Sequence, residues 1–502
     1  MQTRRFAALT GLAAAGVALG VAEVVAILTG ATTSPLVSVG GVVIDSVPAK
    51  VKDFAVAVFY TYDKLALSVG MLIILAIVAA LIGILAARRE IWGYLGLGGF
   101  GVIGIVAALS RHNAPWYAFV PTLVGVLAGA GTLRWLLTRE AGDNATPEER
   151  RSFLRTAGYT LVGAVVVGFA SRWWSTRRGV EADRASVNLP PVAPNSVAPL
   201  PPSADAGLPD LSPFVTPNQD FYRIDTALVV PQLTTEDWQL RIHGRVDKEI
   251  TISWDELLKR PMIERYITLA CVSNEVGGDL ISNTKWQGVR VSDLLDEARP
   301  QAGADQVVSR SIDGFTAGTP TAVLRDGRDA MLAIAMNGEP LPVEHGFPVR
   351  MVVPGLYGYV SATKWLVELE LSSFADFDAY WIKRGWAAQG PIKTESRIDT
   401  PRAGANPRAG EVTIAGVAWA QHRGISKVEI QVDDGAWQTA TLLPVPSTDT
   451  WRQWTLQWQA TPGRHRLTVR ATDNGGQTQT DAVAPPDPDG ATGWHSVNVE
   501  VR

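Results

Sequence analysis

The chain has 502 residues and a formal net charge of −4, and 47% of its residues are hydrophobic. This length exceeds what one hydrophobic core supports, and a typical domain size of about 150 residues predicts roughly three domains. The mild charge and the scattered arginines exclude the strongly basic face of a nucleic-acid-binding protein, so we expect no nucleic-acid partner.

The composition changes sharply along the chain. The first part is dominated by Ala, Val, Leu, Ile and Gly, whereas the second part has the Trp, Arg and Asp content of a soluble protein. The chain is therefore predicted to be multi-domain, with an all-α transmembrane bundle, an α+β domain and an all-β sandwich. The predicted boundaries are 1–180 for the transmembrane anchor, 181–217 for a linker, 218–400 for the α+β domain and 401–502 for the sandwich.

Five stretches of the anchor are long and apolar enough to cross a bilayer, which takes about 20 residues per helix. We expect these spans near residues 6–28, 65–87, 91–109, 116–137 and 157–174. The segment 34–62 carries proline and charged residues and is interpreted as re-entrant or interfacial rather than as a sixth span; these residues are Pro48, Lys50, Lys52 and Asp53.

Basic residues gather on one side of the predicted spans, and this side is expected to be cytoplasmic. They are Arg4, Arg5, Arg88, Arg89, Arg134, Arg139, Arg150, Arg151 and Arg155. The opposite loops carry only Lys50, Lys52, Lys64 and Arg111. With the N-terminus in the cytoplasm, an odd number of five spans places everything after residue 175 outside. Arg172, Arg177 and Arg178 depart from this pattern, because they are basic residues at the expected outer side. We predict a multi-pass plasma-membrane protein with its soluble part extracytoplasmic.

A pair of arginines precedes the fifth expected span. The run Arg150-Arg151-Ser152-Phe153-Leu154-Arg155 resembles a twin-arginine export signal. Such export carries folded proteins, which suits a domain that receives a cofactor before crossing. The alternative is that these arginines are ordinary cytoplasmic anchors.

Prolines are dense from residue 188 to 217 and favour extended polyproline geometry, so this segment is predicted to be a semi-rigid spacer. The next domain mixes strand-like runs with helical patches at 291–298 and 330–336, an α+β pattern; the strand-like runs are 238–246, 266–272 and 349–353. Beyond residue 405, alternating runs separated by turn residues predict an immunoglobulin-like sandwich; they are 411–420, 425–432, 453–459, 464–471 and 493–501.

Cys271 is the single cysteine of the chain, and it follows a strand-like apolar run. A lone thiol outside the cytoplasm has no disulfide partner in the chain and is open to oxidation, so its presence needs a reason. A soft thiolate is a good ligand for a metal. Cys271 is therefore predicted to be a metal ligand, and the alternative is a small buried core residue.

Several ordered motifs surround this cysteine and together resemble the sulfite oxidase family of molybdopterin enzymes. They are Thr216-Pro217-Asn218-Gln219-Asp220-Phe221-Tyr222-Arg223, Met336-Asn337-Gly338-Glu339-Pro340, His345-Gly346-Phe347-Pro348-Val349-Arg350 and Gly358-Tyr359-Val360-Ser361-Ala362-Thr363-Lys364-Trp365. The resemblance covers about residues 210–500, and the sandwich is similar to that family's dimerisation domain. It implies a molybdenum–molybdopterin cofactor, with Cys271 as the protein's covalent ligand to molybdenum, and a homodimer formed through the sandwich.

The resemblance also implies the cofactor contacts. They are Asn218, Tyr222, Arg223, Ser311, His345, Arg350, Ser361, Ala362, Thr363 and Lys364. Arginine and lysine suit the terminal phosphate of the pterin, and Ala362 and Thr363 would offer backbone amides. The structural alternatives are a turn histidine at His345 and solvated strand ends at Arg350 and Lys364.

The chain departs from animal and plant sulfite oxidases near the metal. Those enzymes place a tyrosine five residues after a tryptophan, and counting from Trp381 the matching residue is Trp386. An indole can only donate a hydrogen bond, so sulfite itself is not assigned as the substrate. We expect oxygen-atom transfer on a small sulfur or related oxyanion substrate, with Cys271, Arg223 and Trp386 at the reaction centre and Arg223 holding the anion.

Electron transfer is expected to involve an external partner that the sequence does not identify. The chain has no Cys-X-X-Cys-His haem motif, and His112 is the one histidine near the expected spans. Two alternative functions remain open. One is a sulfoxide or methionine-sulfoxide reductase of the same fold, and the other is a non-catalytic membrane-anchored binding ectodomain.

Overall fold

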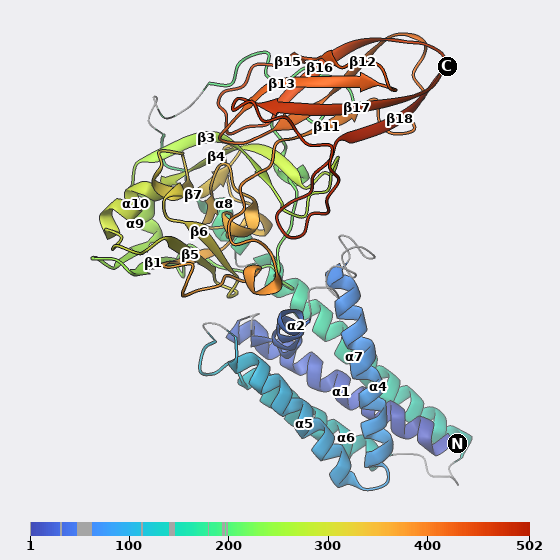
Figure 1. Cartoon of the computed structure of the whole chain (residues 1–502). Helices are drawn as coiled ribbons and strands as arrows, with labels where there is room; N and C mark the ends of the chain where they lie inside the picture. Colours follow the sequence, from blue (N-terminus) through green and yellow to red (C-terminus); the bar gives the residue numbers. More distant parts are fainter. Residues whose placement is uncertain are drawn as a thin grey trace. The chain divides into compact units, whose positions relative to one another are not determined.

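The computed structural model in Figure 1 describes residues 2–30, 33–47, 63–111, 114–139, 146–178, 180–192, 196 and 199–502. Its contacts divide the chain into two compact units. The helical unit comprises Met1–Ala182 with Thr226–Gln232, and the β-rich unit comprises Asp183–Asp225 with Leu233–Arg502.

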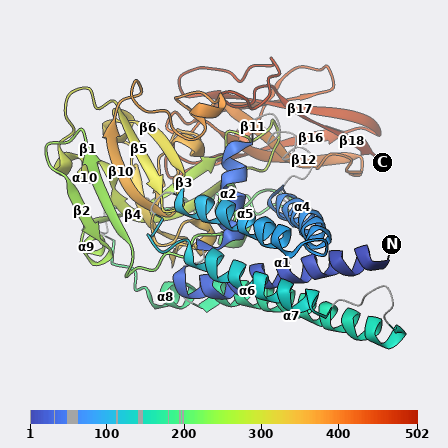
Figure 2. The same ribbon diagram turned by 90° about the horizontal axis from the view of Figure 1, so that it is seen from below.

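The helical unit is a bundle of long apolar helices with one shorter helix, α2. Its helices are α1 (Gln2–Thr29), α2 (Pro35–Ser46), α4 (Asp63–Ala86), α5 (Glu90–Leu109), α6 (Val120–Leu137) and α7 (Pro147–Arg178). Helix α1 packs against α4, α6 and α7 (Figure 2). A Cβ atom at Gly11 would lie 2.0 Å from the carbonyl oxygen of Ala79, so only glycine permits this approach of α1 to α4.

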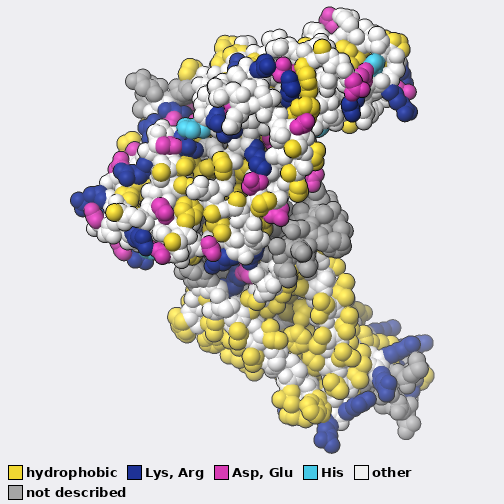
Figure 3. All heavy atoms as spheres, in the orientation of Figure 1, with side chains coloured by type: hydrophobic (Ala, Val, Ile, Leu, Met, Phe, Trp, Pro, Cys, Tyr) yellow, Lys and Arg dark blue, Asp and Glu magenta, His cyan; other side chains and the backbone are white. Residues whose placement is uncertain are grey.

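Four helices are long and apolar enough to cross a membrane: Arg4–Thr29, Ala66–Ala86, Glu90–Leu109 and Val120–Leu137. Hydrophobic side chains also cover the outer surface of this unit (Figure 3). These helices match four of the five expected spans. The fifth falls within α7, where the side chains of residues 169 and 171–178 lie outside the described residues, and a count of five is therefore not confirmed.

The interfacial segment predicted at 34–62 lies only partly within the described residues. Helix α2 occupies its start as a short apolar helix, with Ser34 at the N-cap and Pro35 in the first turn. Residues 48–62 and His112 lie outside the described residues, so the expectations for them stay predictions.

The α+β part of the β-rich unit contains two sheets. The first has the order β2-β1-β10-β5-β6 and is antiparallel except for the parallel pair β1 and β10; its strands are β1 (Gln239–Gly244), β2 (Ile250–Ser253), β5 (Gln306–Ser311), β6 (Thr316–Pro320) and β10 (Leu366–Ser372). The second has the order β3-β4-β7-β8, with β9 also pairing with β7; its strands are β3 (Met262–Ala270), β4 (Ile281–Arg290), β7 (Met331–Met336), β8 (Glu339–Pro340) and β9 (Arg350–Val352). Short helices α8 (Val180–Ser186), α9 (Trp254–Leu258) and α10 (Val291–Ala298) accompany these strands.

One secondary-structure prediction for this part was wrong. Residues 330–336 were expected to be helical, but β7 (Met331–Met336) is a strand between β4 and β9. All six of its residues are buried, so the run is continuously apolar and shows neither helical nor alternating periodicity. The helix predicted at 291–298 is confirmed as α10.

The predicted sandwich consists of two four-stranded sheets. Their orders are β11-β12-β16-β15 and β14-β13-β17-β18; the strands are β11 (Glu395–Thr400), β12 (Gly410–Trp419), β13 (Ile425–Val432), β14 (Gln438–Thr439), β15 (Thr441–Leu442), β16 (Arg452–Ala460), β17 (Gly463–Asp473) and β18 (His495–Val501). Apolar residues from both sheets, including Ile414, Trp454 and Leu467, fill the space between them. Because β11 pairs with β12, the sandwich begins at residue 395, before the predicted boundary at 401.

Part of the predicted proline-rich spacer is packed rather than solvated. Phe214 and Ala204 are almost fully buried in the core of the α+β part. Asn283 of β4 fixes this segment by donating its side-chain amide to the carbonyl of Phe214 at 2.7 Å. The burial of Phe214 contributes about 1.5–3 kcal/mol, which offsets part of the entropy cost of ordering this segment.

Thr268 of β3 joins the α+β part to the sandwich. Its buried hydroxyl accepts a hydrogen bond from the main-chain amide of Trp451 at 2.7 Å and donates to the side-chain oxygen of Asn283 at 2.9 Å. Its carbonyl accepts from the side chain of Gln421 at 3.2 Å. One side chain thus satisfies polar groups on both sides of the junction.

We predict that Thr268→Val destabilises the β-rich unit by about 2–4 kcal/mol, because each buried polar group left unpaired costs about 1–3 kcal/mol. The shape of the side chain is kept, so packing is unchanged. Urea unfolding of the full chain in detergent, followed by tryptophan fluorescence, measures the effect. Thr413→Val is the matched control, since its hydrogen bond to Gln457 is exposed, and equal effects of the two variants would contradict the assignment.

Candidate active site

Cys271 lies directly after β3, at the start of the turn that leads to β4. Its main-chain amide donates to the carbonyl of Leu280 at 2.9 Å, and its carbonyl accepts from the amide of Asn274 at 3.1 Å. Burial raises the pKa of the Cys271 thiol, while hydrogen bonds with Ser273 and the charge of Lys364 act to lower it. A buried thiol of this kind becomes a thiolate when a metal binds it.

No cluster of other metal-ligating side chains accompanies this cysteine. In the part of the chain that the structure describes, no group of three or more His, Cys, Asp or Glu residues could hold a metal ion.

Two cationic side chains meet around Gly346. A Cβ atom at Gly346 would lie 3.1 Å from the Cβ of Arg350 and 3.1 Å from the Cβ of Lys364. Its φ of 111° lies in the left-handed region, so glycine is required both for the backbone and for the space. We refer to Gly346, Arg350 and Lys364 as the cationic cradle.

Arg350 is buried without a carboxylate. Its guanidinium donates to the carbonyls of His345 at 3.1 Å and Ala362 at 3.4 Å and lies 5.1 Å from the Trp286 ring. Among the described residues its Nε has no hydrogen-bond partner, and burial lowers its pKa to about 10. A buried charge is stable only when it is paired, so this arginine is suited to an anionic ligand.

Lys364 shares its one carboxylate with another cation. Its Nζ lies 3.1 Å from Oδ2 of Asp225 and donates to the carbonyl of Glu344 at 3.1 Å. Nε of Arg223 donates to the same Asp225 oxygen at 3.0 Å. Burial lowers the pKa of Lys364 to about 8, although Asp225 acts to raise it. Lys364 and Arg223 thus share one carboxylate, and Arg350 bonds only carbonyl groups among the described residues.

His345 ends the short 3-10 turn Val343–His345 beside the cradle. Burial, followed by the charges of Lys364 and Arg350, lowers its pKa to about 3, so the imidazole is neutral. Its Nδ1 has no hydrogen-bond partner among the described residues, and its ring meets Phe221 edge-on at 5.3 Å. The nitrogen is free to bond a ligand.

Tyr222 and Asn218 come from the entrance segment and reach the same region. The Tyr222 ring stacks on Phe221 at 5.2 Å, and burial raises its pKa. A Cβ atom at Gly358 would lie 3.7 Å from the Tyr222 hydroxyl and from the carbonyl of Ala270, which is ordinary contact distance, so this turn packs against Tyr222 and the end of β3. The amide of Asn218 donates to the carbonyl of Met336 at 3.2 Å.

The remaining predicted cofactor contacts are held by the scaffold. The hydroxyl of Ser361 donates to the carbonyl of Tyr357 at 2.9 Å, the amide of Ala362 donates to Gly358 at 2.9 Å, and Thr363 pairs with Ser309 at 2.7 Å. The hydroxyl of Ser311 lies 3.5 Å from the amide of Asp313 in the turn after β5. Their roles toward a cofactor stay predictions.

Trp386 lies in an aromatic group on the segment after β10. Its ring is 5.9 Å from that of Tyr359 and 6.0 Å from that of Trp381. Tyr359 donates to the carbonyl of Ala387 at 2.8 Å and so ties this segment to the 3-10 turn Gly358–Val360. Trp386 is therefore linked, through Tyr359, to the turn that packs against Tyr222.

Sequence reasoning missed Asp225, which organises Lys364 and Arg223. Its side chain is only 6% exposed. Its place two residues after Arg223 was a signal, but a carboxylate in a loop is most often solvated, and burial follows only from the fold.

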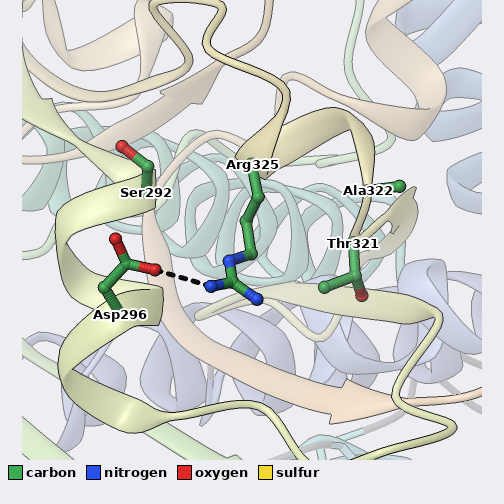
Figure 4. A pocket seen from close by; sticks show the side chains of 5 residues that line it. All are labelled: Ser292, Asp296, Thr321, Ala322 and Arg325. Carbon is green, nitrogen blue, oxygen red and sulfur yellow. Dashed lines mark hydrogen bonds and ion pairs between the residues drawn. The ribbon is translucent and has the colours of Figure 1, made fainter.

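The residues around Cys271 fit the predicted cofactor. The buried positive charge of Arg350 and Lys364, together with Nε of Arg350 and Nδ1 of His345, which have no hydrogen-bond partner in the described part of the chain, suits a ligand that bears a phosphate. A separate cavity of about 400 Å³ lies between α10 and the 3-10 turn Val323–Arg325 (Figure 4). Arg325 and Asp296 form an ion pair of 2.8 Å there, and none of the predicted site residues lines this cavity.

Comparison with known proteins agrees with this geometry. Residues 227–381 match the oxidoreductase molybdopterin-binding domain family, and residues 395–469 match the bacterial Ig domain family. Mitochondrial sulfite oxidase of Macaca fascicularis is 31% identical over 321 residues, which cover 54% of this chain and 58% of that protein. The chain thus spans little more than half the length of this relative.

Two further relatives extend the comparison. The uncharacterized oxidoreductase YuiH of Bacillus subtilis is 33% identical over 187 residues, which cover 36% of this chain and 90% of that protein. The sulfane dehydrogenase SoxCD of Paracoccus pantotrophus shares the fold with a TM-score of 0.50 and 22% identity, over 64% of this chain and 93% of that one. The chain therefore belongs to the sulfite oxidase-like family of molybdopterin-dependent oxidoreductases, and its cofactor is molybdenum–molybdopterin.

Proposed function

We propose that the protein is a membrane-anchored enzyme that transfers an oxygen atom to or from a small sulfur or related oxyanion substrate. The observation that carries this proposal is the buried thiol of Cys271 within reach of the Lys364 charge, where Lys364 and Arg223 share the carboxylate of Asp225 and Arg350 bonds only carbonyl groups among the described residues. When bound, the cofactor supplies the two-electron redox chemistry of the metal and the exchange of the oxygen atom.

The chain's own residues bind and orient the reactants in this proposal. Cys271 ligates molybdenum, and Arg350, Lys364 and neutral His345 hold the pterin and its phosphate. Asn218 and Tyr222 contact the cofactor from the entrance segment, and Ser311, Ser361, Ala362 and Thr363 complete its surroundings. Arg223, with 42% of its side chain exposed, remains accessible to an anionic substrate.

Trp386 favours a second candidate, a sulfoxide or methionine-sulfoxide reductase of the same fold. Its indole can only donate, and it packs on Tyr359 and Trp381 in an apolar wall. A wall of this kind suits the organic side of a sulfoxide better than a small hydrated anion. The two candidates differ in the direction of oxygen transfer and in the polarity of the substrate.

Several further expectations belong to the same proposal. The four candidate spans, and α7 as a fifth, would anchor the enzyme in the plasma membrane with the β-rich unit outside the cytoplasm. An external electron carrier would exchange electrons with the site, and two chains would pair through the sandwich. Export of the folded, loaded domain would use the twin-arginine run that begins at Arg150.

Cys271→Ser is expected to abolish activity, with a loss of at least about 100-fold, because even groups that only support a metal ligand are worth 10–100-fold. The hydroxyl is a poor substitute for a thiolate at this metal. Molybdenum and pterin content of the purified protein, together with circular dichroism, separate loss of chemistry from loss of fold. Ser292→Ala on α10 is the control, and a Cys271→Ser enzyme with full turnover would contradict the ligand assignment.

Trp386→Tyr is expected to raise kcat/KM for sulfite about tenfold, since a phenol can accept as well as donate a hydrogen bond whereas an indole can only donate, and such a bond is worth about 1.5 kcal/mol. Sulfite oxidation with an artificial acceptor and sulfoxide reduction with a reduced viologen are compared for each variant. Trp386→Phe is the matched control because it lacks the hydroxyl. If the Tyr and Phe variants behave alike, this residue does not set the choice of substrate.

Replacing Arg150 and Arg151 together by lysine is expected to leave the first four spans inserted and the β-rich unit in the cytoplasm. Lysine keeps the positive charge that sets topology, whereas a twin-arginine signal requires the arginines. Protease accessibility on intact cells reports where the unit lies. The double change of Arg88 and Arg89 to lysine is the control. If the β-rich unit stays exposed at the cell surface after Arg150 and Arg151 are changed, those two arginines are only topology anchors.

A further inference from the structure

The sandwich contacts the chain on both sides of Cys271. Before the cysteine, the main-chain amide of Thr268 donates to the carbonyl of Asp449, in the loop before β16, at 2.9 Å. After the cysteine, the carbonyl of Gly278 accepts a hydrogen bond from Nη1 of Arg397 on β11 at 2.6 Å. The segment that carries the thiol is therefore attached to the immunoglobulin-like part at two points.

Hydrogen bonds within residues 271–280, which we call the cysteine turn, make this segment a closed unit. The amide of Cys271 donates to the carbonyl of Leu280 at 2.9 Å, and the amide of Asn274 donates to the carbonyl of Cys271 at 3.1 Å. The side-chain oxygen of Asn274, a buried residue, accepts from the amide of Leu280 at 2.8 Å. Because Gly278 lies two residues before Leu280, a shift of Gly278 is transmitted to the backbone of Cys271.

Arg397 is held in the sandwich as a donor with a fixed direction. Its side chain is 10% exposed, and its Nε donates to Oδ1 of Asp399 at 2.6 Å. Its Nη2 donates to the hydroxyl of Ser212 at 2.8 Å, and the amide of Ser212 donates to Oδ2 of Asp399 at 3.0 Å. A planar guanidinium with these partners has little rotational freedom, so Nη1 holds the Gly278 carbonyl at a set position.

His495, the first residue of β18, makes a second contact with the cysteine turn. A Cβ atom at Gly277 would lie 2.2 Å from Cδ2 of His495, and the φ of Gly277 is 77°, so only glycine fits at this position. Nδ1 of His495 accepts from the amide of Ile398 on β11 at 3.0 Å. Burial lowers the pKa of His495, and the charge of Arg397 acts in the same direction, so the ring is neutral and can accept this bond.

We propose that Arg397 and His495 of the sandwich are positioning residues for Cys271, so that the immunoglobulin-like part belongs to the active site. This inference rests on the proposed function, in which Cys271 is the metal ligand, because the direction of a ligand is set by the groups that support it. Both side chains act through the backbone of the cysteine turn, Arg397 at Gly278 and His495 at Gly277, and not on the reacting atoms.

The first test is Arg397→Lys, which keeps a positive charge beside Asp399 but lacks the fork that also reaches Gly278. Turnover per bound molybdenum is measured on the loaded full chain, with sulfite and an artificial acceptor or with a sulfoxide and a reduced viologen. It is expected to fall about tenfold with KM little changed, the size of effect seen for groups that orient a metal ligand. Arg423→Lys is the matched control, because Arg423 pairs with the buried carboxylate of Asp473 in the same sandwich at 2.9 Å. Equal turnover per bound molybdenum in the two variants would make Arg397 merely structural and overturn the proposal.

A second measurement does not depend on catalysis. Hydrogen exchange of the full chain in detergent, followed by mass spectrometry, reports local opening of the cysteine turn. In Arg397→Lys the amides of residues 271–280 are expected to exchange about tenfold faster than in the unaltered chain, whereas Arg423→Lys should leave them unchanged. Exchange in this segment that is the same in both variants would contradict the attachment to β11.

The contact with His495 has its own variant. Gly277→Ala is expected to push the cysteine turn away from the imidazole and to speed exchange of residues 271–280 as well. Gly476→Ala is the matched control, since its φ of 83° imposes the same backbone strain while a Cβ atom there meets open space. Equal exchange of the cysteine turn in these two variants would remove His495 from the proposal.

Two outcomes are kept apart by this design. If Arg397→Lys does not fold, Asp399→Asn weakens the hold on Arg397 without changing the shape of the side chain, and Asp473→Asn is its control; faster exchange of residues 271–280 in Asp399→Asn alone supports the proposal, and equal exchange overturns it. If Cys271→Ser remained active, the proposed function would fail, while hydrogen exchange would still show whether the sandwich holds the cysteine turn.

Discussion

Burial of positive charge without equal negative charge is the constraint on which the site depends. Arg350 contacts only carbonyl groups and the Trp286 ring, and Lys364 must share Asp225 with Arg223. Such an arrangement costs free energy in the empty protein and is stabilised when an anion enters. In the proposed function the family's cofactor is that anion. His345 stays neutral because burial, followed by the charges of Lys364 and Arg350, lowers its pKa.

The scaffold holds this charge in place through backbone features. Gly346 lets the stems of Arg350 and Lys364 meet, and strand β7, buried throughout, fixes β9, which begins at Arg350. Cys271 is placed by the turn between β3 and β4, two strands of the same sheet as β7. Arg350 and the thiol are thus positioned by one sheet, which keeps their spacing insensitive to loop motion.

Much of the fold and of the site could be read from sequence because the signals are local. Runs of alternating apolar and polar residues predicted the strands of the sandwich. The two motifs that contain Gly346 and Lys364 contact each other, and the charge of Lys364 acts on Cys271. Asp225, the strand nature of β7 and the pairing of Glu395 with Trp419 could not be read in this way. Each depends on burial by residues far away in the chain, and a continuous apolar run or an isolated carboxylate looks the same whether or not it is buried.

The place where the sandwich begins has a practical consequence. Strand β11 starts at Glu395 and covers the edge of β12, while Thr268 and Trp451 tie the second half of the sandwich back to β3. A fragment cut at an apparent domain border near residue 401 would bare a long row of unsatisfied amides and carbonyls on β12 and would invite edge-to-edge aggregation. A fragment of the sandwich therefore has to begin before Glu395 to keep β11 on the edge of β12, and it still loses the hydrogen bond between Thr268 and the amide of Trp451.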